Sequence, residues 1–339
     1  MDQKLIQSYV KEWDSSIKLE LIEEITPDAS PRRYARLHIN KNNKADTCVI
    51  VFFNNAASPE AAGEASYSSQ EAYSKLTKVY HENKLPVPNI FYENRMAGVC
   101  ILEDCGDRAV ADYLLANIAN NENVKKYFFQ AIDYIVSMQS IVVVKEDFPF
   151  TRIFSQEILL KEANEYIDYF IPEYVTDINN TAIKEIKSYF EIISKYISTL
   201  PQVFCHRDYH AWNLLIDKNN NIRIIDFQDS LLGPIAYDLA SLLDDRDIDS
   251  ALGERFYDEC LDYFIKKSNS QVSKLQFYIV ALQRDLKVAG RFTKLSNDVS
   301  SHYGLWIPGT IKRIKKLYSK IISIDESFKN DHFNQSFTK

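Results

Sequence analysis

The 339-residue chain has few glycines and no closely spaced cysteine pairs. Only eight glycines occur, and none forms a GxGxxG loop of the kind that covers nucleotide phosphates. The cysteines are Cys48, Cys100, Cys105, Cys205 and Cys260. An odd set without CxxC spacing does not indicate a disulfide framework or a zinc site, so we expect reduced, mostly buried thiols.

Long apolar runs and excess positive charge are also missing. No run approaches the ~20 apolar residues of a membrane helix, and the start, MDQKLIQSYVKEWDSS, has no apolar signal-peptide core. The formal net charge of −7 argues against DNA or RNA as the main partner but leaves a small anionic ligand such as a nucleotide open. We therefore expect a cytoplasmic protein that binds neither membranes nor nucleic acid.

The first hundred residues have the pattern of a small antiparallel sheet with one helix. Residues 18–53 alternate as strands do and are rich in β-branched and aromatic residues. Residues 60–84 carry a helical pattern that ends before Pro86-Val-Pro88, and residues 89–93 and 99–103 resemble two further strands.

The chain becomes helical in pattern from Arg108 onward. Apolar residues recur at helical spacing through 109–141, 155–171, 181–199, 234–243, 253–267, 273–295 and 303–324. Residues 203–229 interrupt this pattern with two short apolar runs, 214–216 and 222–225, around the turn Lys218–Asn221. A β-hairpin is therefore expected inside a helical lobe, and residues after about 324 are expected to fray. The whole pattern predicts an α+β fold.

The segment that carries the most chemical information is His206-Arg-Asp-Tyr-His-Ala-Trp-Asn213, followed by Ile225-Asp226-Phe-Gln-Asp229. Phosphoryl transfer needs a carboxylate for the proton of the acceptor hydroxyl, and oxygen ligands for Mg²⁺ on the phosphates. The hairpin can bring Asn213 and Asp226 to one metal, with Asp208 nearby as the base. Asp208 or Asp226 alone would read as a turn cap or a strand end, but the ordered set favours catalysis.

The sequence HRDYHAWNLLID…IRIIDFQDSLLGPIAYDLASLL resembles the aminoglycoside phosphotransferase superfamily, which has the protein-kinase-like bilobal fold. The part IDFQD…GP…YDL…LL is most similar to the bacterial anomeric amino-sugar kinases, which phosphorylate N-acetylmuramate and N-acetylglucosamine at the C1 hydroxyl in cell-wall recycling. Weaker likeness covers residues 28–36, 101–106 and 283–287.

The resemblance implies a β-rich nucleotide-binding lobe (1–103), a hinge (104–107), a helical catalytic and substrate lobe (108–325) and a polar tail (326–339). It implies ATP and Mg²⁺ as cofactors, Asp208 as catalytic base, and Asn213 and Asp226 as Mg²⁺ ligands. For Asp229 three roles stay open: it could meet a second metal, contact the substrate, or cap the following turn. His206, Arg207 and Asp238 are expected to brace the loop, and His210 either lines the acceptor pocket or belongs to the core.

The side of the site that would hold phosphate is less well specified. The third strand, Cys48-Val-Ile-Val-Phe-Phe53, has no lysine where kinases carry their phosphate-binding one. The Ser30 hydroxyl with Arg32 or Arg33 could bind phosphate instead, although strand alternation cannot turn both arginines inward. Backbone groups around Glu103, Asp104 and Cys105 are expected at an adenine edge, by analogy of fold.

Three further residues are candidates for the acceptor. Arg284 and Lys287 share a helix face and could meet a carboxylate such as that of muramate, or form a solvated basic face. Glu162 could contact sugar hydroxyls.

The main hypothesis is an amino-sugar kinase with a small hydroxyl-bearing acceptor. The alternatives are another small-molecule kinase of the aminoglycoside or choline type, or a nucleotide-binding regulator without catalysis. The acidic run Asp244–Asp247 keeps a polycationic aminoglycoside open, since such a substrate needs an acidic cleft.

Overall fold

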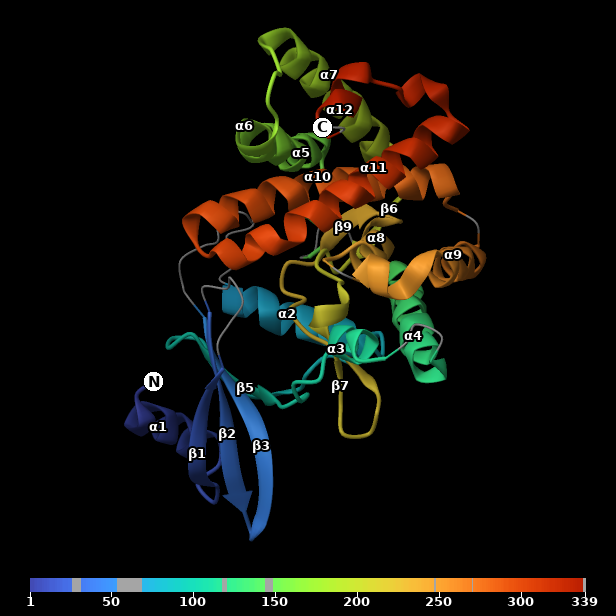
Figure 1. Cartoon of the computed structure of the whole chain (residues 1–339). Helices are drawn as coiled ribbons and strands as arrows, with labels where there is room; N and C mark the ends of the chain where they lie inside the picture. The colour runs from blue at the N-terminus through green and yellow to red at the C-terminus, as the bar shows by residue number, and fades with distance from the viewer. Residues whose placement is uncertain are drawn as a thin grey trace.

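The computed structural model describes residues 1–25, 32–53, 69–117, 121–143, 149–246, 248–269 and 271–337. A small lobe built on a β-sheet stands against a larger lobe built of helices (Figure 1). This confirms the predicted α+β class. Within the described residues, no helix is both long and apolar enough to cross a bilayer.

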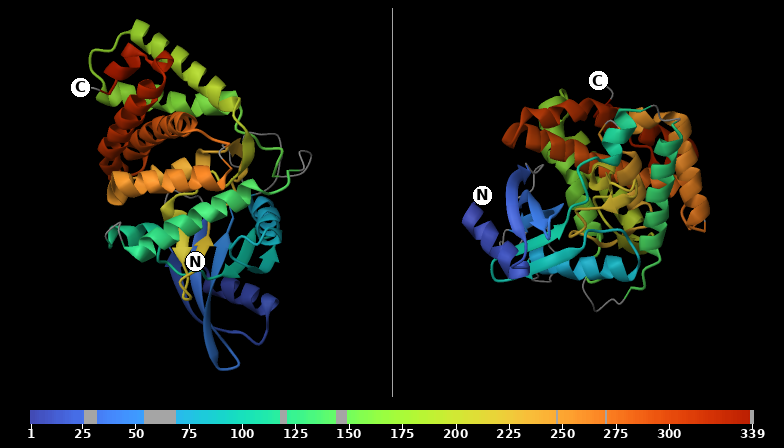
Figure 2. Two further views of the ribbon diagram at one scale, coloured as in Figure 1. Left: turned by 90° about the vertical axis from the view of Figure 1, so that its right-hand side faces the viewer. Right: turned by 90° about the horizontal axis from the view of Figure 1, so that it is seen from below.

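The small lobe is a five-stranded antiparallel sheet in the order β1-β2-β3-β5-β4. Its strands are β1 (Lys18–Ile25), β2 (Arg33–Lys41), β3 (Lys44–Phe52), β4 (Ile90–Asn94) and β5 (Val99–Glu103). Helix α1 (Gln3–Trp13) covers the outer face, away from the helical lobe (Figure 2). Its first turn is capped by Asp2, whose carboxylate accepts from the amides of Lys4 and Leu5.

Strand β2 shows which side chains face the helical lobe. Ala35 and Leu37 are buried against α1, so Tyr34 and Arg36 point to the opposite, inner face. Tyr34 packs there on the main core.

Helix α2 (Ser69–Glu82) packs against the residues that follow Asp226. The rings of Tyr73 and Tyr80 lie 4.7 and 5.0 Å from that of Phe227, and the Tyr80 hydroxyl is 2.9 Å from Ser230 Oγ. The residues next to Asp226 are therefore held by aromatic packing between the lobes. The part of the predicted helix before residue 69 lies outside the described residues.

The large lobe contains α3 (Val110–Leu115), α4 (Glu122–Gln139), α5 (Gln156–Glu165), α6 (Ile171–Tyr174), α7 (Asn180–Ser198), α8 (Tyr237–Leu243), α9 (Ile248–Lys267), α10 (Lys274–Asp298), α11 (Ile307–Ile324) and α12 (Asp331–Gln335). A π-helical turn, Tyr166–Phe170, links α5 to α6, and a kink at Gly253 divides α9. The predicted helices are confirmed, although the ranges 109–141 and 155–171 are each broken into shorter pieces.

The predicted hairpin is formed by β7 (Leu214–Ile216) and β8 (Ile222–Ile224), with Leu214 opposite Ile224. Its turn is held by Asp217 Oδ1, which accepts from the amides of Asn219 and Asn221. A second pair, β6 (Gln202–Cys205) with β9 (Leu231–Pro234), lies on either side of it in sequence. Residues 206–213 and 225–230 therefore connect the strands of two short antiparallel pairs beneath α10 (Figure 1).

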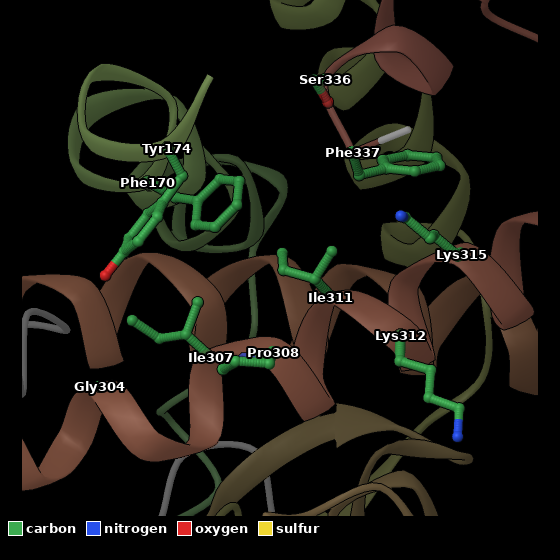
Figure 3. Close-up of a pocket in the computed structure, with 10 residues that line it drawn as sticks. All are labelled: Phe170, Tyr174, Gly304, Ile307, Pro308, Ile311, Lys312, Lys315, Ser336 and Phe337. Carbon is green, nitrogen blue, oxygen red and sulfur yellow. The ribbon is translucent and has the colours of Figure 1, made fainter. Parts of the chain in front are cut away.

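The expectation that the chain frays after about residue 324 is wrong. Residues Glu326–Phe328 form a 3₁₀ turn and α12 follows, with Phe333 fully buried between Tyr189 and Tyr318. The aromatic side chains of this polar segment supply apolar area whose burial outweighs the cost of ordering it. Phe337 also lines a cavity of about 470 Å³ between α6 and α11 (Figure 3). None of the predicted site residues lines that cavity.

Candidate active site

The loop that carries Asp208 is clamped at its start by Asp238. This carboxylate, in the first turn of α8, accepts from the backbone amides of His206 (2.7 Å) and Arg207 (3.0 Å). Arg207 has a positive φ of 79°, a conformation that non-glycine residues adopt only when the surroundings enforce it. Asp238 provides that enforcement, in keeping with the bracing role expected from the sequence.

His206 ties the loop to the end of the hairpin. Its Nε2–H donates to the carbonyl oxygen of Ile225 at 3.0 Å. Burial lowers the pKa of His206 to about 4, so the ring is neutral at physiological pH. The ring therefore acts as a neutral strut between the Asp208 loop and the residue before Asp226.

Asn213 and Asp226 meet at the open end of the hairpin. Because Leu214 pairs with Ile224, Asn213 lies opposite Ile225, whose amide donates to the Asn213 carbonyl at 3.0 Å. The Asn213 side-chain amide donates to the Asp208 carbonyl at 3.0 Å, so Oδ1 is the side-chain atom that could coordinate a metal. Asp226 has a φ of 62°, a strained conformation of the kind found at functional sites.

These residues fit a magnesium ion. Arg32 and Gln228 both contact Oδ1 of Asp226, and no described residue donates to its Oδ2. The Asp226 side chain is 39% exposed. Within the described residues, no group of three or more His, Cys, Asp or Glu side chains is arranged to hold a metal. Oxygen ligands from Asn213 and Asp226, completed by phosphate and water, suit Mg²⁺.

Asp208 lies among positive charges. Burial alone would raise the pKa of its carboxyl, but the charges of Lys287 and Arg207 lower it below the ordinary value. Lys287 Nζ and an Arg207 guanidinium nitrogen each lie 3.1 Å from the same oxygen of Glu162. Glu162 thus pairs with both of the cations that lower the pKa of Asp208.

Gln228 is a site residue that the sequence reasoning missed. Its side-chain amide donates to Asp226 Oδ1 (3.1 Å) and Asp229 Oδ2 (2.9 Å), and so bridges the two carboxylates. Arg152 approaches Asp229 at 3.4 Å and donates to the Gln228 carbonyl at 3.2 Å. Asp229 therefore belongs to the same cluster as Asp226. No local pattern marks Arg152, since it lies 77 residues before Asp229 in the chain.

The two predicted arginines of the phosphate side differ in position. Arg32 is only 11% exposed and lies 3.3 Å from Asp226, whereas Arg33 is exposed and begins β2. The inward residue is therefore Arg32, and Arg33 is turned away from the cluster. Ser30 lies outside the described residues.

The two acidic side chains of the predicted hinge region, Glu103 and Asp104, form ion pairs with arginines. Glu103 forms a bidentate pair with Arg223 (2.6 and 2.7 Å), and Asp104 accepts from Arg36 (2.7 and 3.3 Å). Cys105 is buried, and burial raises the pKa of its thiol to about 12. Main-chain groups around residues 103–105, not the acidic side chains, are thus what an adenine could meet.

Arg284 has partners other than a substrate. It is 5% exposed, and its guanidinium contacts Ser241 Oγ (2.9 Å), the Asp244 carbonyl (2.6 Å) and Asp245 (3.5 Å). The structure therefore disfavours the predicted carboxylate-binding role, because binding would require breaking a buried network. Asp244 and Asp245 are buried too, so neither presents an exposed carboxylate to a polycation. Asp247 of the same run lies outside the described residues.

Two tryptophan rings contact Arg246, and one of them lies beside Asn213. Arg246 lies between the faces of Trp212 (5.5 Å) and Trp306 (4.8 Å). Trp212 directly precedes Asn213, and the nearby His210 accepts from the Asn213 amide at 3.3 Å. Arg246 therefore engages a face of the tryptophan that directly precedes Asn213.

Comparison with known proteins shows the family of this chain. A family model described as the phosphotransferase enzyme family matches residues 22–270. The N-acetylmuramate/N-acetylglucosamine kinase of Neisseria meningitidis serogroup B is 25% identical over 337 residues, covering 93% of this chain and 92% of that protein.

Solved structures share the fold at lower identity. The choline kinase LicA from Streptococcus pneumoniae has a TM-score of 0.59 and 14% identity, over 95% of this chain and 99% of that one. The ADP-bound aminoglycoside phosphotransferase APH(2'')-Ib has a TM-score of 0.57 and 15% identity, over 94% and 97%. These likenesses confirm the protein-kinase-like fold.

Proposed function

Because the chain belongs to the phosphotransferase enzyme family, we propose that it transfers the γ-phosphoryl group of MgATP to the anomeric hydroxyl of an N-acetylated amino sugar. The observation that carries the proposal is that hydrogen bonds hold the segments of Asp208, Asn213 and Asp226 close together. One hydrogen bond joins the Asn213 amide to the Asp208 carbonyl, and another joins His206 to Ile225, next to Asp226.

In the proposed reaction, Asp208 accepts the proton of the acceptor hydroxyl as the oxygen–phosphorus bond forms. The bond between the γ-phosphorus and the bridging oxygen breaks, and ADP carries away the electron pair. Asn213 and Asp226 would hold Mg²⁺, which neutralises charge on the phosphates. The lowered pKa of Asp208 suits this role, because the carboxylate is ionised before the acceptor arrives.

An amino sugar is favoured over an aminoglycoside by two observations. The relatives named as N-acetylmuramate/N-acetylglucosamine kinases include one that matches along nearly its whole length. Asp244 and Asp245, which could have formed an acidic cleft for a polycation, are instead buried with Tyr257 and Arg284.

The test is a coupled ATP-consumption assay with N-acetylmuramate, N-acetylglucosamine, glucose, choline and kanamycin as acceptors. We expect Mg²⁺-dependent turnover on one or both N-acetylated sugars and loss of the reducing end in the product. The matched control is the 1-O-methyl glycoside of N-acetylglucosamine, which has no anomeric hydroxyl and should not react. Activity on the glycoside would refute anomeric transfer, and activity only on kanamycin or choline would refute the sugar. ATP binding without turnover on any acceptor would favour the regulator.

A further inference from the structure

After its first residue, strand β3 has no cation where kinases carry a phosphate-binding lysine. Residues 45–53 of β3 and its end contain neither lysine nor arginine. The negative charge of the triphosphate must nevertheless be balanced on this side of the cleft, because catalysis of phosphoryl transfer depends on charge neutralisation. A cation from another element of the small lobe is therefore needed.

Arg32 is placed to supply it. It directly precedes β2, and its side chain reaches across to the large lobe, where it lies 3.3 Å from Asp226. By strand alternation Arg32 shares the inner face with Tyr34 and Arg36. Its charge interacts with both Asp226 and Asp229, and Tyr34 and Tyr73 are close to it.

The neighbouring arginines pair with other carboxylates or lie on the other face of the sheet. Arg36 forms a close pair with Asp104 at the hinge (2.7 Å), and Arg152 faces Asp229 from the large lobe. Arg33 lies on the outer face and is exposed. Arg32 is therefore the small-lobe arginine that meets the predicted metal-binding carboxylate directly.

We propose that Arg32 is the phosphate-binding cation of this chain and takes the place of the missing strand lysine. Without nucleotide, its guanidinium is held by Asp226. A divalent ion on Asp226 would repel it, and the guanidinium would then pair with the phosphate oxygens, for which its planar fork is well suited. The inference rests on the proposed use of MgATP and is independent of the acceptor.

The test measures Mg²⁺-dependent binding of ATP, ADP and AMP by calorimetry. The variants are Arg32→Ala and Arg32→Lys. The matched control is Arg33→Ala, which removes a side chain of the same charge from the next residue along the chain. We expect Arg32→Ala to weaken ATP binding by about tenfold or more, as loss of a charge-assisted pair does. AMP, which lacks the β- and γ-phosphates, should bind within about threefold of the parent, and this also shows that the variant is folded. Arg32→Lys should restore part of the ATP affinity, and Arg33→Ala should bind ATP like the parent.

Two results would overturn the assignment while leaving the proposed function standing. One is Arg32→Ala with the ATP affinity of the parent, and the other is equal weakening of ATP and AMP, which indicates a structural role. If the parent protein itself bound no adenine nucleotide, both the inference and the proposed function would be wrong.

Discussion

Gly290 on α10 is the position at which one added methyl group should disturb both the fold and the catalytic loop. A Cβ built there would lie 2.2 and 2.3 Å from the carbonyl carbon and oxygen of Glu165 and 2.6 Å from the amide of Tyr166. Ordinary contacts begin near 3.4 Å, so α10 and the junction of α5 with the π-helical turn would have to separate by about 1 Å.

The expected cost of Gly290→Ala follows from two opposing effects. Alanine is about 1 kcal/mol better than glycine inside a helix. Overpacking costs about 1–3 kcal/mol, and the upper end applies because the clash is with backbone atoms. We therefore expect a net loss of about 2 kcal/mol in the free energy of unfolding, measured by urea denaturation as a lower midpoint with an unchanged slope.

The same displacement should reach the active site. Lys287 lies one turn before Gly290 and pairs with Glu162 on α5, which in turn holds Arg207 beside Asp208. Moving α5 away from α10 would stretch these pairs. We expect kcat to fall while the KM for ATP stays close to that of the parent, because the hinge lies in another part of the molecule.

Gly309→Ala is the matched control, since its added Cβ would meet Arg246 O at 3.8 Å and Arg313 at 4.0 Å, both ordinary contacts. It lies in the first turn of α11 and should leave stability unchanged or raise it by up to about 1 kcal/mol. A Gly290→Ala protein as stable as the Gly309→Ala protein would refute the packing argument.

Three further predictions concern the catalytic cluster. Asp208→Asn should lower kcat by about 10²-fold or more with little change in MgATP affinity; turnover within a few-fold of the parent would show that Asp208 is not the base. Asp226→Ala should abolish the Mg²⁺ dependence of ATP binding in calorimetry, and normal MgATP binding would rule Asp226 out as a ligand. The buried His206 has a pKa of about 4, against ~6.5 in an unfolded chain, so the unfolded state binds the proton more readily between these values. The free energy of unfolding should fall by up to about 3 kcal/mol as the pH drops from 6.5 to 4. In the His206→Gln variant, urea denaturation at pH 6.5 and pH 4 should show a smaller fall in the free energy of unfolding. The same fall as in the parent would contradict the assignment of this pH dependence to His206.

The sequence was sufficient where the chemistry depends on residues close together in the chain. Asp208, Asn213 and Asp226 could be named because a short hairpin joins them, and pairing of Leu214 with Ile224 follows from the length of the turn. The sheet and the helices followed from periods of two and 3.6 residues, which reflect the local geometry of the backbone.

The sequence could not show which of Arg32 and Arg33 faces the large lobe. It established that only one of the two could face inward, but the choice depends on which face of the sheet α1 covers. That is decided by packing between elements far apart in the chain. Arg284 and Lys287 are similar, because one turn of α10 places them near different neighbours, Asp245 and Glu162.

Other features were invisible before the chain was folded. The clamp of Asp238 on His206 spans 32 residues, and the contact of Arg152 with Asp229 spans 77. The order of the C-terminal segment comes from burial of Phe333 among rings of α7 and α11. By itself, then, the sequence predicted the class of fold that the structure confirms, and the close approach of Asp208, Asn213 and Asp226, because local backbone geometry brings those residues together. Only the tertiary structure decided which cations surround them, because burial and long-range charge pairing depend on the whole packed molecule.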